Sequence, residues 1–158
     1  MTERQHKFSG TKEVQEHLSF DHLKLSAWMG ANVADFSGPL TVKEFKGGQS
    51  NPTYQLITPT KRYVLRRKPP GVLMPSAHAV DREYRVIAAL GKTDFPIPKA
   101  YALCEDVEVI GTMFYVMEMV DGRIFWDLSL PDQTKSERAN IYRSKLETLA
   151  RLQKINPS

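Results

Sequence analysis

The sequence contains a single cysteine, Cys104, and no long apolar run. One cysteine excludes an intrachain disulfide framework and a CxxC metal site, so we expect a reducing, cytoplasmic setting. No segment approaches the roughly eighteen successive apolar residues that a membrane-spanning helix needs. The N-terminal residues also lack the apolar core of a secretory signal peptide. The sequence therefore predicts a protein without a membrane partner.

The sequence also lacks low-complexity tracts and internal repeats. Its 158 residues are 41% hydrophobic and 25% charged, which is the composition of a globular protein able to bury a core. The net charge is only +4, and part of it gathers at residues 61–68. Exposed aromatics do not alternate with these cations as they do on a nucleic-acid surface. We therefore expect a small phosphate ligand and no nucleic acid.

The first half of the chain predicts a leader, a helix and three strands. Residues 1–19 are polar and irregular, which favours a flexible leader. Asp21 is suited to cap a short helix, with Leu23, Ala27 and Trp28 on one side. Short turns then separate three strands, which predicts an antiparallel meander. The predicted strands are 40–46, 54–58 and 62–67.

The second half predicts a helix over 76–90, with Ser76 as its N-cap, followed by a hairpin. The hairpin pairs 100–104 with 112–119, and a long helix follows over 136–155. The expected fold is α+β, with the five strands in one antiparallel sheet. The long helix carries an apolar face, so we expect it to contact a partner surface or to form a dimer. That face consists of Ile141, Tyr142, Leu146, Leu149 and Leu152.

One acidic residue lies on the apolar side of the predicted helix over 76–90. At about 100° per residue, Glu83 falls between Leu90 and Ile87 on the helical wheel. A carboxylate that faces the core is costly unless a cation meets it. The sequence therefore predicts a basic partner for Glu83 on a neighbouring element.

Arg66 is the residue that can meet this carboxylate. It lies seventeen residues before Glu83, and Val64 and Arg66 share one face of their strand. The Gly47-Gly48 turn, with Ser50 and Asn51 after it, can cradle phosphate oxygens with backbone N–H groups. A glycine loop, a strand cation and a helix glutamate together are typical of kinase nucleotide sites.

Taken singly, Gly47-Gly48 could be a simple hairpin turn, and Arg66 and Glu83 could be solvated. His78 is interpreted as a surface residue or a helix-start residue.

Several segments in collinear order resemble the aminoglycoside phosphotransferase family. They are Gly47–Tyr54 (GGQSNPTY), Tyr63–Gly71 (YVLRRKPPG), Ala79–Arg85 (AVDREYR), Phe95–Pro98 (FPIP) and Phe114–Arg123 (FYVMEMVDGR). The resemblance covers roughly residues 20 to 155. It is greatest to the kinase-like domains that are linked to acyl-CoA dehydrogenases.

The resemblance implies a protein-kinase-like N-terminal lobe over 20–120 and a hinge exit with the start of a C-terminal lobe over 121–158. It implies that Arg66 replaces the usual strand lysine and that Glu83 is its helix partner. It also implies that adenine bonds to the Glu118 carbonyl and the Val120 N–H. Val64 and Met117 would pack near the base. The implied phosphate loop consists of Gly47, Gly48, Ser50 and Asn51.

The same resemblance implies a phosphotransferase that uses ATP or GTP with Mg²⁺ to phosphorylate a hydroxyl group on a small acceptor. The linked branch suggests an acceptor similar to a hydroxyacyl-CoA. In this family the transfer residues lie in a His-Gly-Asp…Asn segment and a later Asp motif. None of the four histidines precedes Gly-Asp, so we expect no catalytic or metal-binding residues in this chain. We also expect it to be truncated and inactive alone.

Two alternatives to a phosphotransferase remain open from the sequence. The chain could be a non-catalytic nucleotide-binding or interaction module, or a basic nucleic-acid-binding domain. A strong salt dependence of oligonucleotide binding, without binding of Mg-ATP, would favour the last of these.

Overall fold

The computed structural model describes residues 7–47, 50–71, 74 and 77–156. Its contacts divide the chain into two compact units. The larger unit is Ser9–Gly122, and the smaller one joins Met1–Phe8 to Arg123–Ser158.

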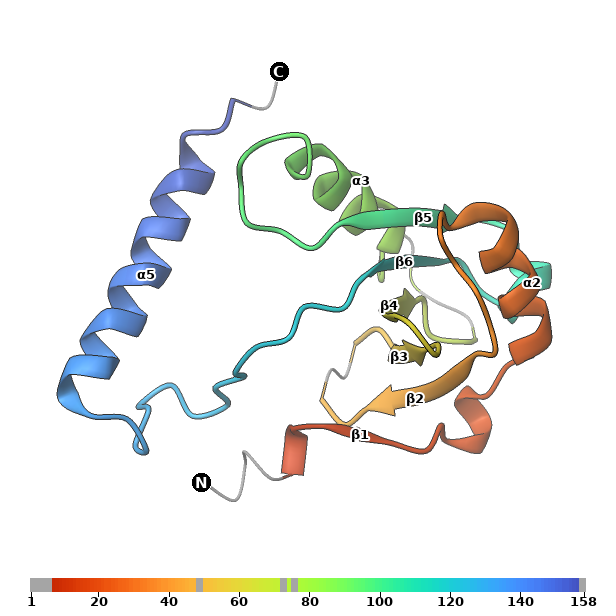
Figure 1. The fold of residues 1–158 in the computed structure, drawn as a ribbon, viewed down its shortest axis with the longest axis horizontal. Coiled ribbons are helices and arrows are strands. Elements are labelled where there is room, and N and C mark those ends of the chain that lie inside the picture. The colour runs from red at the N-terminus through yellow and green to blue at the C-terminus, as the bar shows by residue number, and fades with distance from the viewer. Residues whose placement is uncertain (1–6, 48–49, 72–73, 75–76, 157–158) are drawn as a thin grey trace. The chain divides into compact units, whose positions relative to one another are not determined.

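The larger unit is built on one antiparallel sheet of six strands in the order β1-β2-β3-β4-β6-β5 (Figure 1). Its α+β architecture and the predicted meander of β2, β3 and β4 are confirmed. Register places Arg66 opposite Thr53 on one side and Tyr115 on the other. The strands are β1 Thr11–Lys12, β2 Thr41–Phe45, β3 Thr53–Ile57, β4 Arg62–Arg67, β5 Ala100–Cys104 and β6 Phe114–Glu118.

The sixth strand, β1, lies inside the segment that the sequence predicts as a flexible leader. Thr11 and Lys12 pair with the edge strand β2, and a short 3-10 helix, η1 (Glu16–Leu18), follows. Glu44 of β2 holds the same segment, because its carboxylate accepts hydrogen bonds from the backbone and side-chain nitrogens of Gln15 at 3.1 and 2.9 Å. The expected count of five strands was therefore one too few. Backbone pairing at a sheet edge needs no apolar pattern, and so no residue pattern in this segment indicates a strand.

Helix α2 (His22–Asn32) begins where it was predicted. The Asp21 carboxylate accepts from the backbone N–H groups of Leu23 and Lys24 at 2.8 and 3.1 Å, as an N-cap should. Of the residues predicted to share one side of this helix, Leu23 is 82% exposed and Ala27 is also exposed. Leu25 and Met29 are the buried residues of this helix.

Helix α3 (Val80–Leu90) starts later than the predicted residue 76. Ala79 occupies the N-cap position without a side-chain bond, and Ser76 lies outside the described residues. A further helix, α4 (Val107–Ile110), was missed. Asp106 caps it, and Gly111 ends it with a φ of 85°, a left-handed conformation that glycine adopts without strain. Helix α4 connects β5 to β6, so the predicted hairpin is present with a helical connection.

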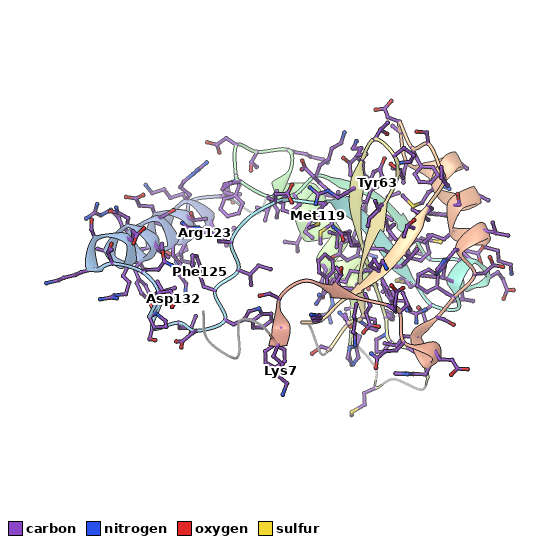
Figure 2. All side chains as sticks on the ribbon, turned by 60° about the horizontal axis from the view of Figure 1, so that its bottom comes forward. Lys7, Tyr63, Met119, Arg123, Phe125 and Asp132 are labelled. Atoms are coloured by element: carbon purple, nitrogen blue, oxygen red, sulfur yellow. The ribbon has the colours of Figure 1, made fainter. Side chains whose placement is uncertain are left out.

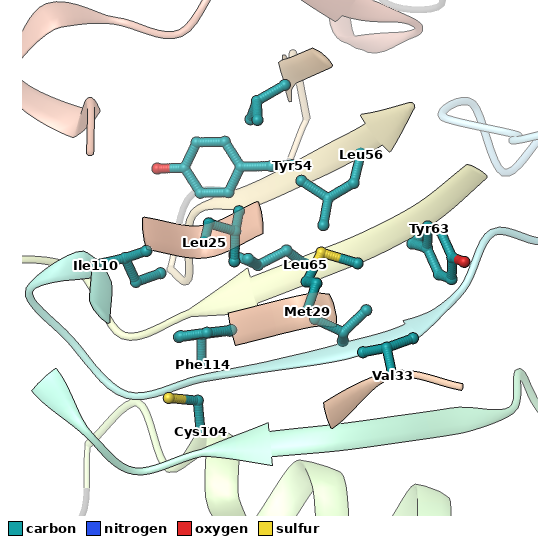
Figure 3. Close-up of a cluster of buried hydrophobic side chains, with 12 residues drawn as sticks. Leu25, Met29, Val33, Tyr54, Leu56, Tyr63, Leu65, Cys104, Ile110 and Phe114 are labelled. Atoms are coloured by element: carbon teal, nitrogen blue, oxygen red, sulfur yellow. The ribbon is translucent and has the colours of Figure 1, made fainter. Parts of the chain in front are cut away.

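The core lies between α2 and one face of the sheet (Figure 3). Leu25 and Met29 of α2 pack with side chains that alternate along β3, β4 and β6. These strand residues are Tyr54, Leu56, Tyr63, Leu65, Phe114 and Val116. Strand residues two apart share a face, so the neighbours of this set point to the opposite side of the sheet.

Arg67 also belongs to the core face, although it is an arginine. It is 2% exposed, and its guanidinium donates to the carbonyls of Ile110 and Leu18 at 3.2 and 2.9 Å. The rings of Phe20 and Tyr54 lie 5.1 and 5.5 Å from its guanidinium carbon. The charge is therefore buried against carbonyl oxygens and aromatic faces.

The smaller unit contains helix α5 (Lys135–Gln153), close to the predicted range of 136–155. Thr134 and Glu137 form a capping box at its start. In the segment before it, the guanidinium of Arg123 lies 5.2 Å from the ring of Phe125 (Figure 2). Several apolar side chains of α5 are exposed, namely Tyr142, Leu146, Leu149 and Leu152. Within the described part of the chain, no helix combines the length and apolar character needed to cross a bilayer.

Candidate functional site

The face of the sheet opposite the core carries a cleft of about 980 Å³. Helix α3 forms one wall, because it contacts β5 and β6 on this side. Strands β4 and β6 supply alternate residues to the cleft, with Arg66 next to Tyr115 in register. The polar residues that line it include Ser50, Asn51, Arg66, His78, Arg82, Glu83 and Tyr115. Met117, Val86 and Ile87 add apolar surface.

The predicted contact between Arg66 and Glu83 is present. Arg66 Nε donates to Glu83 Oε2 at 2.8 Å, and Arg66 Nη1 donates to Thr53 Oγ1 at 3.2 Å. The two side chains of the pair are 30% and 35% exposed. The pair therefore lies in the wall of an open cleft and is less deeply buried than the helical wheel suggested. A charged pair in this setting orients its members more than it stabilises the fold.

Two further donors hold the Glu83 carboxylate. The Tyr115 hydroxyl donates to Oε2 at 3.1 Å, and Asn51 Nδ2 donates to Oε1 at 3.1 Å. Burial raises the pKa of Tyr115 above its usual value of 10.0, and the neighbouring Glu83 charge raises it further. Tyr115 therefore remains a protonated donor at neutral pH. The carboxylate is fixed from three directions, and it fixes Arg66 in turn.

His78, which the sequence predicts as a surface or helix-start residue, lies directly before the N-cap of α3 and at the cleft. It lines the cleft, and its Nδ1 lies 2.7 Å from Oδ1 of Asn51. Its backbone is left-handed, with a φ of 56°, a conformation in which histidine is more common than most residues. The signal that could have found it is the late start of α3, which leaves His78 in a turn. No simple residue pattern reveals that start, because Ala79 caps the helix without a side-chain bond.

The predicted site residues fall into two groups. Ser50, Asn51, Arg66, Glu83 and Met117 are brought together around the cleft. Of the remaining predicted residues, Gly47, Val64, Glu118 and Val120 do not line it among the residues that the structure describes. Gly48 lies outside the described residues.

Val64 and the predicted hinge lie next to the cleft along the strands. Val64 is buried on the same face of β4 as Arg66 and pairs with Met117 in register. Glu118 ends β6, and its backbone N–H and its carboxylate both bind the backbone of Lys99. Val120 is 58% exposed. Their contacts with adenine remain a prediction.

The charges around the cleft suit an anion. Arg66 and Arg82 line it together with one carboxylate, Glu83, which is already paired. Over the ranges that the structure describes, no three His, Cys, Asp or Glu side chains gather to form a metal site. The two arginines that line the cleft are suited to contact a phosphate group directly.

Comparison with known proteins gives the family. The model of the phosphotransferase enzyme family (APH) matches residues 41–158. A solved structure from Ralstonia eutropha JMP134, assigned to the aminoglycoside phosphotransferases, aligns with a TM-score of 0.66 and 52% identity. The alignment covers 79% of this chain and 35% of that one.

Curated relatives include acyl-CoA dehydrogenase family members 11 and 10. The human family member 11 is 44% identical over 152 residues, covering 94% of this chain and 20% of the relative. The mouse family member 10 is 43% identical over 147 residues, covering 92% of this chain and 14% of the relative. The chain thus spans about a fifth or less of the length of these relatives.

Proposed function

The chain belongs to the phosphotransferase enzyme family, and from this we propose that its cleft binds the phosphates of a nucleoside triphosphate, ATP or GTP. The observation that carries the proposal is the ion pair of Arg66 with Glu83, 2.8 Å long, in the wall of an anion-compatible cleft. A strand cation held by a helix carboxylate is the arrangement that kinase-like enzymes use to orient phosphates.

Arg66 is suited to this role because its position is set before a ligand binds. Glu83 and Thr53 hold Nε and Nη1, and among the described residues Nη2 has no partner. A guanidinium keeps its charge at every working pH and presents donors in a rigid plane. Because the side chain is already oriented, less conformational entropy is lost when it binds a phosphate oxygen.

The remaining parts of the nucleotide extend from this contact. The phosphate loop consists of Gly47, Gly48, Ser50 and Asn51, which precede β3 in the sequence. Val64 and Met117 form an apolar surface for the base. The hinge binds adenine through the Glu118 carbonyl and the Val120 N–H. Magnesium accompanies the nucleotide as its counter-ion, as is general for phosphoryl transfer.

The acceptor is a hydroxyl group on a small molecule, and the acyl-CoA dehydrogenase names of the relatives favour one similar to a hydroxyacyl-CoA. The transfer step needs a carboxylate near that hydroxyl. Among the described residues that line the cleft, Glu83 is the one carboxylate, and Arg66, Tyr115 and Asn51 already occupy it. We therefore propose that this chain supplies nucleotide binding and that transfer requires residues outside it.

Calorimetric titration of the purified protein tests the proposal. We expect Mg-ATP or Mg-GTP to bind, and Arg66→Ala to weaken that binding about tenfold to a hundredfold, the loss of one charge-assisted hydrogen bond. Arg62→Ala is the matched control, because Arg62 lies on the same strand but pairs with Asp121 away from the cleft. Absence of nucleotide binding, together with salt-dependent binding of an oligonucleotide, would contradict the proposal.

A second candidate is a nucleotide-binding module without phosphoryl transfer. The observation that favours it is that Glu83, the one carboxylate among the described residues that line the cleft, is already hydrogen-bonded to Arg66 and Tyr115. The two candidates differ in turnover. Transfer of labelled phosphate from ATP to a hydroxyacyl-CoA by the longest form of the protein would support the enzyme, while tight binding without transfer would support the module.

A further inference from the structure

We propose that His78 is a further phosphate-binding residue of the cleft and that it takes up a proton when a phosphate group binds. This inference rests on the proposed function. It adds one phosphate-binding residue, and it links nucleotide binding to proton uptake by that residue. The observation that carries it is a chain of hydrogen bonds that runs from Glu83 through Asn51 to His78.

The direction of each bond in this chain follows from the Glu83 carboxylate. An ionised carboxylate only accepts hydrogen bonds, so the Asn51 atom 3.1 Å from Glu83 Oε1 is the amide nitrogen, as the structure has it. The amide oxygen of Asn51 therefore faces His78. Because that oxygen only accepts, Nδ1 of His78 must carry the hydrogen of the 2.7 Å bond. Asn51 is 3% exposed, so water has little access to replace either partner.

The distal nitrogen of His78 is consequently the atom that changes with protonation. In the neutral ring with hydrogen on Nδ1, Nε2 has a lone pair and can only accept a hydrogen bond. In the charged ring, Nε2 also donates. A phosphate oxygen is repelled by the first form and bound by the second. Phosphate binding and proton uptake at His78 are therefore linked.

The surroundings of His78 favour an anion at this position. The charged groups of α3 that line the same cleft are Arg82 and Glu83, and β4 contributes Arg66. Strand β6 contributes Tyr115, a neutral donor to Glu83. The Glu83 charge is offset by Arg66 at 2.8 Å, so this carboxylate repels an anion beside His78 less than an unpaired carboxylate would. The backbone of His78 is left-handed, and the 2.7 Å bond to Asn51 fixes the orientation of its ring.

The variant His78→Asn distinguishes the role of Nδ1 from the role of Nε2. Asparagine tolerates the left-handed conformation, and its side-chain amide nitrogen can replace Nδ1 as the donor to Asn51. The variant has no equivalent of Nε2. It should therefore keep the local structure and lose the phosphate contact alone, which an intact thermal unfolding curve checks independently.

The experiment is calorimetric titration of the purified protein with Mg-ATP and with adenosine, in buffers of different ionisation enthalpy. Histidine side chains ordinarily titrate between about pH 5 and 8, so we expect the wild-type protein to take up as much as about one proton per nucleotide in that range. We expect His78→Asn to abolish this uptake and to weaken Mg-ATP binding about tenfold near pH 6. Adenosine binding should be unchanged, because adenosine has no phosphate. Comparing the two proteins at each pH cancels the titration of ATP itself.

The outcomes separate the two proposals. Equal proton uptake and equal Mg-ATP affinity in the wild type and in His78→Asn would overturn the role of His78 while leaving nucleotide binding intact. An equal loss of affinity for adenosine and Mg-ATP would also overturn it, since that pattern indicates a structural role. If the wild-type protein binds no nucleotide, the proposed function fails, and the inference about His78 fails with it.

Discussion

The two faces of the sheet use neighbouring residues of one strand for opposite purposes. Arg66 and Arg67 are adjacent on β4, yet Arg67 is buried against carbonyl oxygens and aromatic rings, while Arg66 lies in the wall of an open cleft. The strand period of two makes this division. Residue type alone therefore does not identify a functional arginine. The face of the sheet on which the arginine lies and the group that it binds do identify it.

The partners of the two arginines show the same contrast. Arg67 binds neutral carbonyls of Leu18 and Ile110, and so it links two separate segments to the core face of the sheet. Arg66 binds a carboxylate and a hydroxyl within the cleft. A buried cation without a carboxylate serves packing, and a half-exposed cation oriented by a carboxylate is available to a ligand.

The largest effect on stability is expected on the core face. Phe114 is fully buried and stacks edge-on against Trp28 with ring centroids 4.8 Å apart. Phe114→Ala should lower the free energy of unfolding by about 3–5 kcal/mol, because it leaves a cavity. Denaturant titration measures this change. Met117→Ala on β6, which faces the cleft, is the matched control, and an equal loss in that variant would break the distinction between the faces.

The adjacent arginines give the sharpest version of the comparison. Arg67→Ala should lower the free energy of unfolding by about 2–3 kcal/mol, since it removes packing and leaves the Ile110 carbonyl without its donor. Arg66→Ala should change stability by less than about 1 kcal/mol, because its ion pair is partly exposed. Thermal unfolding of both variants, followed by titration with Mg-ATP, measures the contrast. Reversed effects would mean that the faces have been assigned wrongly.

Glu83→Gln tests whether the open face depends on an oriented cation. The substitution keeps the size of the side chain but removes the charge that holds Arg66 Nε. We expect about tenfold weaker binding of Mg-ATP and a stability loss of about 1 kcal/mol or less. Calorimetry and denaturant titration on one preparation provide both values. A loss of several kcal/mol in stability with unchanged nucleotide affinity would instead make Glu83 a structural residue.

The smallest effect is expected for Tyr115, on the decrease of the free energy of unfolding at alkaline pH. The folded-state pKa of Tyr115 is raised by burial and by Glu83 above the usual value of 10.0. Its contribution to stability is therefore complete below about pH 10 and is lost as the pH rises further. Tyr115→Phe should make this loss shallower, at a cost of about 1 kcal/mol at neutral pH for the missing hydrogen bond. Urea titrations from pH 8 to 11 test it, and an unchanged alkaline slope would contradict the account.

Periodic patterns predicted most of the fold from the sequence. The alternation in β4 and the Asp21 cap of α2 are local features, and the structure has both as expected. Strand β1 and the start of α3 were missed, because one depends on backbone pairing with a distant edge and the other on a turn without a capping side chain. Short-range patterns do not contain either piece of information.

The pairing of Arg66 with Glu83 was predictable, because it follows from the charge of the two residues and from the position of Glu83 on the helical wheel. Glu83 on an apolar stripe required a cation, and Arg66 was the cation on the appropriate strand. His78 was not predictable in the same way, because its contact with Asn51 joins two loops across the chain. Arg67 was missed as a core residue, since nothing in its neighbours along the sequence indicates that carbonyls of Leu18 and Ile110 converge on it.

The side-chain Nε–H signals of Arg66 and Arg67 in a nitrogen-15 NMR titration with Mg-ATP test the central claim most directly. One signal reports the open face and the other reports the core face of the same strand. We predict that the Arg66 signal shifts in a saturable manner with added Mg-ATP, while the Arg67 signal stays in place. An Arg66 signal that does not respond to saturating Mg-ATP would contradict the claim that the Glu83-held guanidinium binds the nucleotide.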